Sequence, residues 1–333
     1  MTKPILKVEN LTTQFFTYAG IVQAVRGISF EIYPGEAVGL VGESGCGKSV
    51  TGLSIMRLIP NPPGKIVSGS VYLDKENLLE FSEKEMRSVR GNEISMIFQD
   101  PMTSLNPVFS IGYQIMETLL LHQKITKKQA KEKAIKLLDM VHIKSPEEVI
   151  NRYPHQLSGG MRQRVMAAIA ISCEPQIIIA DEPTTSLDVT IQAQILNLLT
   201  DLKTKLNSSI VLITHNLAVV AGLCSRVLVM YAGLIMEEGT DMQIYNDPMH
   251  PYTWGLMKAV PKINEEEKKR LMTIPGLPPD LLSPPEGCPF ALRCDYAMHI
   301  CFRKKPPFFE PQKGHKVACW LMDPRASRVK RSM

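Results

Sequence analysis

The 333-residue chain has few of the features that mark secreted, disulfide-bonded or membrane-spanning proteins. Its 7 cysteines are too sparse for a small disulfide scaffold. Its longest uncharged apolar run, residues 227–236, is about half as long as a membrane-spanning helix needs to be. Residues 1–10 contain neither an apolar core nor a small-residue cleavage site, so nothing there indicates export. We therefore expect a cytoplasmic protein that does not itself form a pore.

What the chain does contain is unevenly distributed. A hydrophobic fraction of 44% and a charged fraction of 21% are typical of globular proteins, and the length suits one large domain with a small one. Residues 241–333 carry 15 Lys or Arg against 10 Asp or Glu, which accounts for the whole net charge of +5. They also hold 13 of the 24 prolines and four of the 7 cysteines. We predict two domains, 1–240 and 241–333.

The strongest motif is a phosphate loop at residues 42–49, after an apolar run at 38–41 that predicts a buried strand. Its sequence, Gly-Glu-Ser-Gly-Cys-Gly-Lys-Ser, fits G-x-x-x-x-G-K-[ST] at every fixed position. Glycines let backbone N–H groups converge on phosphate oxygens, Lys48 supplies positive charge, and Ser49 offers a hydroxyl to Mg²⁺. The nucleotide-binding residues predicted here are Gly42, Glu43, Ser44, Gly45, Cys46, Gly47, Lys48, Ser49 and Val50. The alternative is a chance glycine-rich turn, and we interpret Cys46 as a small loop residue and not as a nucleophile.

Two carboxylates follow a second apolar run, at residues 177–180. Such a run predicts a central parallel strand buried on both faces, and ligands of α/β sheets bind at the ends of such strands. Asp181 is suited to hold Mg²⁺, and Glu182 to polarise the attacking water. The alternative is that Asp181 only caps the following helix.

A second anion-binding helix start lies between these motifs, where Leu157, Ser158, Gly159 and Gly160 precede a helix predicted over 161–171. One nucleotide does not need two such sites in one chain. Ser158, Gly159 and Gly160 are therefore expected to serve the γ-phosphate of a nucleotide bound to another subunit. At this point the chain resembles the ATP-binding-cassette (ABC) ATPases, whose signature sequence begins Leu-Ser-Gly-Gly.

The resemblance implies roles for further residues. Gln99 matches the family's glutamine loop, which contacts Mg²⁺ and water. Ser186, Leu187 and Asp188 match the loop that crosses the interface between two cassettes, and His215 matches the switch histidine at the γ-phosphate. With Glu182, these residues form the predicted catalytic set of Glu182, His215 and Gln99, and the predicted Mg²⁺ ligands are Ser49, Gln99 and Asp181.

The aromatic residue that stacks on adenine is assigned to Tyr18, with Phe15 and Phe16 as neighbouring alternatives. The resemblance also implies the fold class, an α/β P-loop NTPase. It comprises a RecA-like core, an antiparallel β subdomain, a helical signature subdomain at about 100–165, and a small loop-rich metal-binding extension at the C-terminus. Apolar periodicity predicts helices at Ile111–His122 and Lys127–Met140. We leave open whether Met96, Met102, Ile115 and Met116 belong to a docking groove for a membrane partner or to the core.

The C-terminal segment indicates which group of ABC ATPases the chain resembles. His250, Pro251 and Tyr252 match the His-Pro-Tyr extension of ATPases from oligopeptide, dipeptide and nickel importers, and the D-type subunit of dipeptide importers is the nearest form. Two basic clusters, 303–305 and 325–331, are expected to be solvated surface near a membrane partner. No interleaved aromatic residues accompany them, so we expect no nucleic-acid binding.

Four cysteines lie in this segment, at Cys288, Cys294, Cys301 and Cys319. A reducing cytosol disfavours disulfides, and four thiols in a loop-rich segment suggest a metal site. The wide spacing without a C-x2-C knuckle favours a [4Fe–4S] cluster, with Zn²⁺ or free thiols as alternatives. The resemblance adds that some peptide-importer ATPases carry such a cluster here.

The predicted function is therefore an ATP-hydrolysing subunit that uses ATP and Mg²⁺ to power import of di- or oligopeptides. The implied partners are a second homologous ATPase in a heterodimer, or a homodimer in isolation, two transmembrane permease subunits and, indirectly, an extracytoplasmic binding protein. The expected location is peripheral, at the cytoplasmic face of the inner membrane. The alternatives are an importer of nickel or another small solute, and a soluble ABC ATPase of DNA repair or translation.

Overall fold

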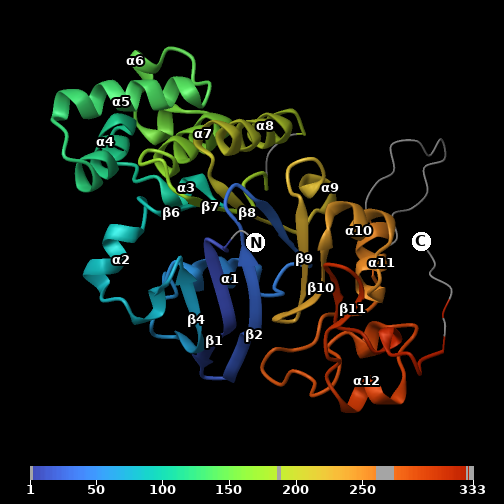
Figure 1. Cartoon of the computed structure of the whole chain (residues 1–333). Helices are drawn as coiled ribbons and strands as arrows, with labels where there is room; N and C mark the ends of the chain where they lie inside the picture. Colours follow the sequence, from blue (N-terminus) through green and yellow to red (C-terminus); the bar gives the residue numbers. More distant parts are fainter. Residues whose placement is uncertain (1–2, 186–188, 260–273, 328, 330–333) are drawn as a thin grey trace. The chain divides into compact units, whose positions relative to one another are not determined.

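The structure, a computed structural model, describes residues 3–185, 189–259, 274–327 and 329. The chain divides into two compact units, and Figure 1 labels their helices and strands. Unit 1 comprises Met1–Ile5, Ile32–Ala37 and Asn77–Ile213, and unit 2 comprises Leu6–Glu31, Val38–Glu76 and Thr214–Met333. Each unit therefore combines segments that are distant in the sequence.

Unit 1 is built on parallel strands in the order β8-β7-β6. These are β6 (Ile94–Ile97), β7 (Ile177–Asp181) and β8 (Ser209–Thr214). Every residue of β7 is buried, which confirms the strand predicted from the apolar run and explains it, since a central parallel strand is covered on both faces. The helices are η1 (Leu78–Glu80), α2 (Glu83–Val89), α3 (Pro101–Ser104), α4 (Ile111–His122), α5 (Lys127–Met140), α6 (Pro146–Val149), η2 (Pro154–Gln156), α7 (Gly159–Ala170) and α8 (Val189–Leu206).

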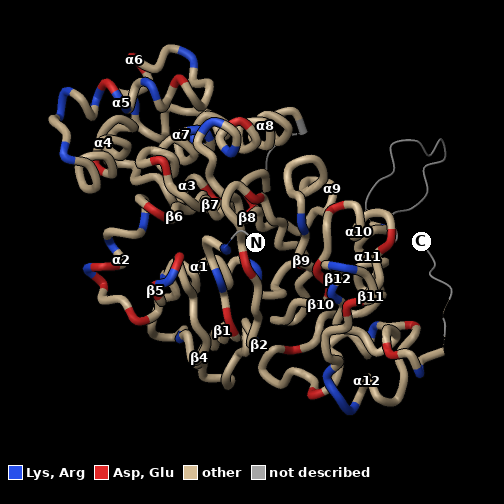
Figure 2. The backbone as a smooth tube through the Cα atoms, in the orientation of Figure 1, with Lys and Arg blue, Asp and Glu red and all other residues tan. Residues whose placement is uncertain are grey.

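The helical part of unit 1 follows the sequence pattern closely, because α4 and α5 have the predicted bounds. Thr126 and Gln129 form a capping box that starts α5. The buried stripe of this helix consists of Ala130, Ala134, Leu137 and Leu138, at the spacing of one helix face. Figure 2 shows basic residues along the rest of α5. The helix thus forms by burying a narrow apolar stripe and exposing its lysines.

The four residues that could belong either to a docking groove or to the core differ in their exposure to solvent. Met96 is 9% exposed and Ile115 is fully buried, so both belong to the core. Met102, in contrast, is 63% exposed at the start of the helical part, and Met116 is intermediate. Only Met102 is plainly available to a partner.

Unit 2 contains an antiparallel sheet of four strands in the order β2-β1-β4-β5. Its strands are β1 (Leu6–Thr17), β2 (Gly20–Ile32), β4 (Gly64–Leu73) and β5 (Glu76–Asn77). The register of β1 against β4 runs from Leu6 opposite Leu73 to Phe15 opposite Gly64. Alternate residues of β1 are buried along much of its length, the pattern of a sheet with one covered face.

A second sheet of unit 2 has the order β11-β12-β10-β9-β3. Its strands are β3 (Ala37–Val41), β9 (Arg226–Tyr231), β10 (Leu234–Thr240), β11 (Phe309–Gln312) and β12 (His315–Val317). β3 and β9 are parallel, whereas β10 pairs antiparallel with both β9 and β12. The helices of this unit are α1 (Lys48–Ile55), α9 (Leu217–Val220), α10 (Asp241–Asn246), α11 (Pro251–Lys258), η3 (Ala291–Arg293), α12 (His299–Arg303) and η4 (Trp320–Met322). The C-terminal extension thus adds two strands to the sheet that contains β3.

A buried carboxylate holds the extension against β10. Glu237 is fully buried, and it accepts hydrogen bonds from the backbone N–H groups of Met249 at 2.7 Å and His250 at 3.0 Å. The hydroxyl of Thr253 donates to the same carboxylate, and His315 Nε2 lies 2.7 Å from it. Both carboxylate oxygens therefore have hydrogen-bond partners from the protein, which offset the cost of burying the group.

His250 also starts α11, since its Nδ1 accepts a hydrogen bond from the Tyr252 N–H at 3.0 Å. The ring is 1% exposed. Burial lowers the pKa of His250 to about 4, although the charge of Glu237 opposes this shift. The folded protein therefore keeps this imidazole neutral near pH 7.

This burial predicts a loss of stability in mild acid. In the unfolded chain the histidine has a pKa near 6.5. Between about pH 6.5 and 4 the unfolded chain therefore binds a proton at this histidine, whereas the folded chain does not. The free energy of unfolding is expected to fall across this range by up to about 3 kcal/mol from this residue. Urea unfolding at several pH values measures the fall. His250→Asn keeps a capping acceptor and removes the titration, and an equally steep pH dependence in that variant would contradict the prediction.

Candidate nucleotide-binding site

The predicted phosphate loop follows β3 and leads into α1, with Gly47 at the N-cap. Lys48 is only 4% exposed. Its ammonium donates to the carbonyl oxygens of Gly42 at 2.9 Å and Glu43 at 3.0 Å. The lysine is therefore folded across the loop, which places a positive charge inside the concave backbone that the motif predicts.

Two glycines of the loop are required by close packing. A Cβ on Gly42 would lie 2.1 Å from the backbone oxygen of Met230, and one on Gly47 would lie 2.3 Å from that of Ala24. Gly47 also has a φ of 105°, which favours glycine. The loop is thus pressed against the neighbouring strands β2 and β9.

The thiol of Cys46 shares this environment. It is 5% exposed, and burial raises its pKa. A nucleophilic cysteine needs a lowered pKa and access to solvent. The observed setting favours the interpretation of Cys46 as a small residue that fits the loop.

The two predicted carboxylates lie at the end of β7 in unit 1, where Asp181 is the last residue of the strand and Glu182 follows it. Asp181 is 5% exposed and Glu182 is 9% exposed. The Glu182 carboxylate accepts hydrogen bonds from Gln99 Nε2 at 3.1 Å and from Thr185 Oγ1 at 2.8 Å. Glu182 also has a φ of 44°, an unfavourable conformation for a residue with a side chain and one that clusters at functional sites. The structure therefore brings Gln99 and Glu182 together, and it adds Thr185, which no sequence motif singled out.

The signature segment, residues 157–160, starts α7 in unit 1. Leu157 is buried, and the Ser158 hydroxyl caps the helix by accepting from the Met161 N–H at 3.3 Å. Apart from its chain neighbours and the backbone of its own helix, no described atom lies within 4 Å of the position that a Cβ on Gly159 would take, whereas one on Gly160 would meet Ile191 at 3.1 Å. The backbone at Gly159 is therefore open to approach from outside.

The remaining predicted residues are placed as follows. His215 follows β8 and is exposed. Tyr18 is fully exposed in the turn between β1 and β2, while Phe16 is 47% exposed and Phe15 is partly buried. Ser186, Leu187 and Asp188 lie outside the described residues. The phosphate loop, Tyr18 and His215 belong to unit 2, and the carboxylates, Gln99 and the signature segment belong to unit 1.

The four extension cysteines interact with one another. The pKa of Cys288 is raised to about 12 and that of Cys294 to about 11, mainly by burial and in smaller part by the neighbouring Cys301. Burial also raises the pKa of Cys319, with added contributions from the other three thiols. Within the described residues, however, no group of three or more His, Cys, Asp or Glu side chains is arranged to hold a metal ion. The predicted metal site therefore receives no support from the structure.

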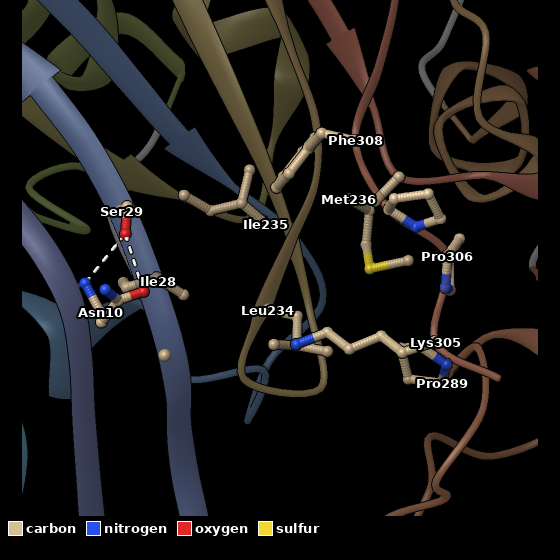
Figure 3. Close-up of a pocket in the computed structure, with 13 residues that line it drawn as sticks. Asn10, Ile28, Ser29, Leu234, Ile235, Met236, Pro289, Lys305, Pro306 and Phe308 are labelled. Atoms are coloured by element: carbon tan, nitrogen blue, oxygen red, sulfur yellow. Dashed lines mark hydrogen bonds between the residues drawn. The ribbon is translucent and has the colours of Figure 1, made fainter.

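A pocket of about 310 Å³ lies elsewhere in unit 2, between the β strands and the extension (Figure 3). Its polar groups include Asn10, whose backbone N–H donates to the Ser29 hydroxyl at 2.8 Å, and Lys305. Burial lowers the pKa of Lys305. None of the residues predicted to bind nucleotide lines this pocket.

Across the part of the chain that the structure describes, no helix is long and apolar enough to cross a membrane.

Comparison with known proteins extends these observations. Residues 25–185 match the family model "ABC transporter", and residues 236–301 match "Oligopeptide/dipeptide transporter, C-terminal region". The structure is similar to the dimeric post-hydrolysis state of the ATP-binding cassette MJ0796 bound to ADP and Pi. The TM-score is 0.64 at 28% identity, over 71% of this chain and 98% of that one. This likeness confirms the α/β fold of an ABC ATPase.

Relatives match over nearly the whole chain. The oligopeptide transport ATP-binding protein OppD of Bacillus subtilis is 53% identical over 325 residues, 98% of this chain and 91% of that protein. The dipeptide transport ATP-binding protein DppD of Lactococcus lactis is 51% identical over 326 residues, 98% of this chain and 93% of that protein. The chain belongs to the ABC transporter ATPases of the oligopeptide and dipeptide transport family.

The packing of the phosphate loop predicts unequal effects of two glycine substitutions. Gly45 has a φ of 79° with nothing within 4 Å of an added Cβ, whereas Gly47 combines its positive φ with the contact to Ala24. Gly45→Ala is expected to cost about 1 kcal/mol of unfolding free energy, and Gly47→Ala about 2 kcal/mol or more because backbone must move. Thermal unfolding of the full chain measures both. Equal losses would contradict the packing argument.

Proposed function

We propose that this chain hydrolyses ATP to power the import of di- or oligopeptides as a subunit of an ABC importer. The observation that carries the proposal is the match over nearly the whole chain to peptide transport ATP-binding proteins, together with a complete phosphate loop. Residues 1–240 form the nucleotide-binding domain in this proposal, and residues 241–333 form the extension typical of peptide importers. No comparable observation favours nickel import, or a role in DNA repair or translation.

The chemistry assigned to the site is attack of water on the γ-phosphorus of ATP, which breaks the bond to the β-phosphate oxygen and yields ADP and phosphate. Lys48 and the loop N–H groups bind the phosphates. Glu182 orients the water and accepts its proton, and its bonds from Gln99 and Thr185 hold the carboxylate in place. His215 contacts the γ-phosphate, and Tyr18 stacks on adenine with its fully exposed ring.

Mg²⁺ fits the donor set of Ser49, Asp181 and Gln99, which offers only oxygen ligands. When bound, the ion neutralises charge that develops on the phosphate oxygens. The protein's own contribution is to supply these oxygen donors, and the nearly complete burial of Asp181 limits the freedom of its carboxylate to move.

A second cassette completes each site in this proposal. The open backbone at Gly159, in the first turn of α7, supports the assignment of 158–160 to the γ-phosphate of the partner's ATP, since a helix start binds anions. The partner is a second homologous ATPase in the transporter, with a homodimer possible in isolation. Residues 186–188 are assigned to the interface between the two.

Two transmembrane permeases are the other partners. Met102, Val108, Phe109 and Tyr113 are 40–70% exposed at one end of the helical part, and an apolar surface of this kind suits a short helix from a permease. The chain is then peripheral at the cytoplasmic face of the membrane. It contacts the extracytoplasmic binding protein only through the permeases, and it does not bind nucleic acid.

The proposal predicts a defined defect for Glu182→Gln. The amide cannot accept the proton of water, so turnover in the assembled transporter is expected to fall about 100-fold or more, while ATP binding is retained. Phosphate release and nucleotide binding measure the two properties separately. Glu132→Gln, on the exposed face of α5, is the matched control with unchanged turnover. An ATPase rate near that of wild type in Glu182→Gln would refute the assignment.

We also propose that Cys288, Cys294, Cys301 and Cys319 ligate a [4Fe–4S] cluster. The donor set fits in kind, since four thiolates are what such a cluster requires. Two of the four residues are direct neighbours, because the backbone N–H of Cys288 donates to the carbonyl oxygen of Cys301 at 2.7 Å. The cluster would join segments of the extension covalently and so stabilise it.

Anaerobic purification with iron and sulfide analysis tests this assignment, and about four of each per chain are expected. Cys301→Ser is expected to lose the iron, whereas Cys173→Ser, in a buried cysteine of unit 1, keeps it. Zinc in place of iron, or metal-free protein, would overturn the cluster.

A further inference from the structure

The extension contacts the phosphate loop through Glu43, the second residue of the loop. Arg293, from η3, donates through Nη1 to Glu43 Oε2 at 2.6 Å and through Nη2 to Oε1 at 2.9 Å. The pair is bidentate, and the side chains are 5% and 25% exposed. A charge-assisted pair of this geometry is among the stronger polar interactions in proteins. It joins two residues that are 250 positions apart in the sequence.

Every N–H of the Arg293 guanidinium has a partner. Besides Glu43, Nη1 donates to the Tyr231 hydroxyl at 3.1 Å, Nη2 to the carbonyl of Ile274 at 3.0 Å, and Nε to that of Pro275 at 2.9 Å. Because the guanidinium offers five donors in a rigid plane, this arrangement fixes its orientation. The Arg293 side chain is therefore held in one orientation by its hydrogen bonds, unlike the side chain of a solvent-exposed arginine.

A second residue of the extension holds the backbone of Glu43. The hydroxyl of Tyr252 accepts a hydrogen bond from the Glu43 N–H at 2.8 Å. Its ring is fully buried and lies against Tyr231 and Phe290, with ring centroids 4.6 and 5.4 Å away. Burial raises the pKa of Tyr252 well above its usual value, so the hydroxyl stays neutral.

Glu43 in turn positions the lysine of the loop. Its carbonyl oxygen accepts from Lys48 Nζ at 3.0 Å, so the residue that Arg293 and Tyr252 hold is one that receives the phosphate-binding ammonium. The Arg293 charge also compensates a carboxylate that would otherwise stand beside bound phosphates and repel them.

From these contacts we infer that Arg293 and Tyr252 are positioning residues for the phosphate loop. By holding Glu43 they fix the backbone that receives Lys48 and neutralise the nearby carboxylate, so ATP affinity depends on the C-terminal extension. The inference rests on the proposed ATPase function and deepens it. A purely structural tether would leave ATP affinity unchanged when the pair is broken.

The test uses the full-length chain and measures the Kd of a fluorescent ATP analogue with Mg²⁺, and then KM and kcat for ATP in the assembled transporter. Arg293→Ala is expected to raise Kd and KM about tenfold, with kcat changed by less than about twofold, since the lost restraint acts on binding. Arg293→Lys, which keeps the charge and loses the fork, is expected to lie between this variant and wild type. Arg325→Ala is the control, because Arg325 is an exposed arginine of the same extension paired with Asp323.

A double variant tests whether Arg293 affects ATP binding through Glu43. If Arg293 acts through Glu43, then Glu43→Gln combined with Arg293→Ala is expected to bind ATP no more weakly than Arg293→Ala alone. Additive losses would overturn the inference, as would wild-type Kd and KM in either Arg293 variant. If Arg293→Ala does not fold, Arg293→Lys and Glu43→Gln decide the question with the same readouts. A wild-type chain that fails to bind ATP would refute the proposed function and the inference together, whereas normal binding that is insensitive to Arg293 would refute only the inference.

Discussion

The arrangement of the C-terminal extension depends on one buried charge, the carboxylate of Glu237 on β10. A buried carboxylate without partners would cost several kcal/mol, so its surroundings must supply donors. They come from the start of α11 and from His315 on β12. Satisfying this charge therefore fixes the start of α11 and the strand β12 against β10, in addition to the apolar packing of residues such as Tyr252 and Phe290.

Two described residues of this extension contact the phosphate loop, Tyr252 and Arg293. Tyr252 belongs to α11 itself, and Arg293 lies between α11 and β12. A loop that offers its N–H groups to phosphate has fewer of them for internal hydrogen bonds, so restraint from other parts of the chain is of particular value to it. Glu43 receives that restraint at its backbone and at its side chain, which gives the extension a physical connection to nucleotide binding.

Much of the fold follows from local sequence patterns. The periodicity of α4 and α5 fixed their bounds, and the apolar run of β7 identified a strand covered on both faces. Motif spacing also singled out Gln99 and Glu182, which the structure joins by a hydrogen bond. The short strands β11 and β12 had no such pattern. β12 pairs along the edge of β10, and β11 pairs in turn with β12, so this pairing is set by the sheet and not by the segment.

The sequence by itself determined the motifs, their order and the family, because a phosphate loop or an amphipathic helix is specified by residues close together in the chain. Only the tertiary structure decided the partners of the charged and polar side chains. Arg293 had no distinguishing context in the sequence, and Thr185 had no motif. Their roles arise from contacts with Glu43 and Glu182. Such contacts depend on where folding places each side chain, which spacing along the chain does not encode.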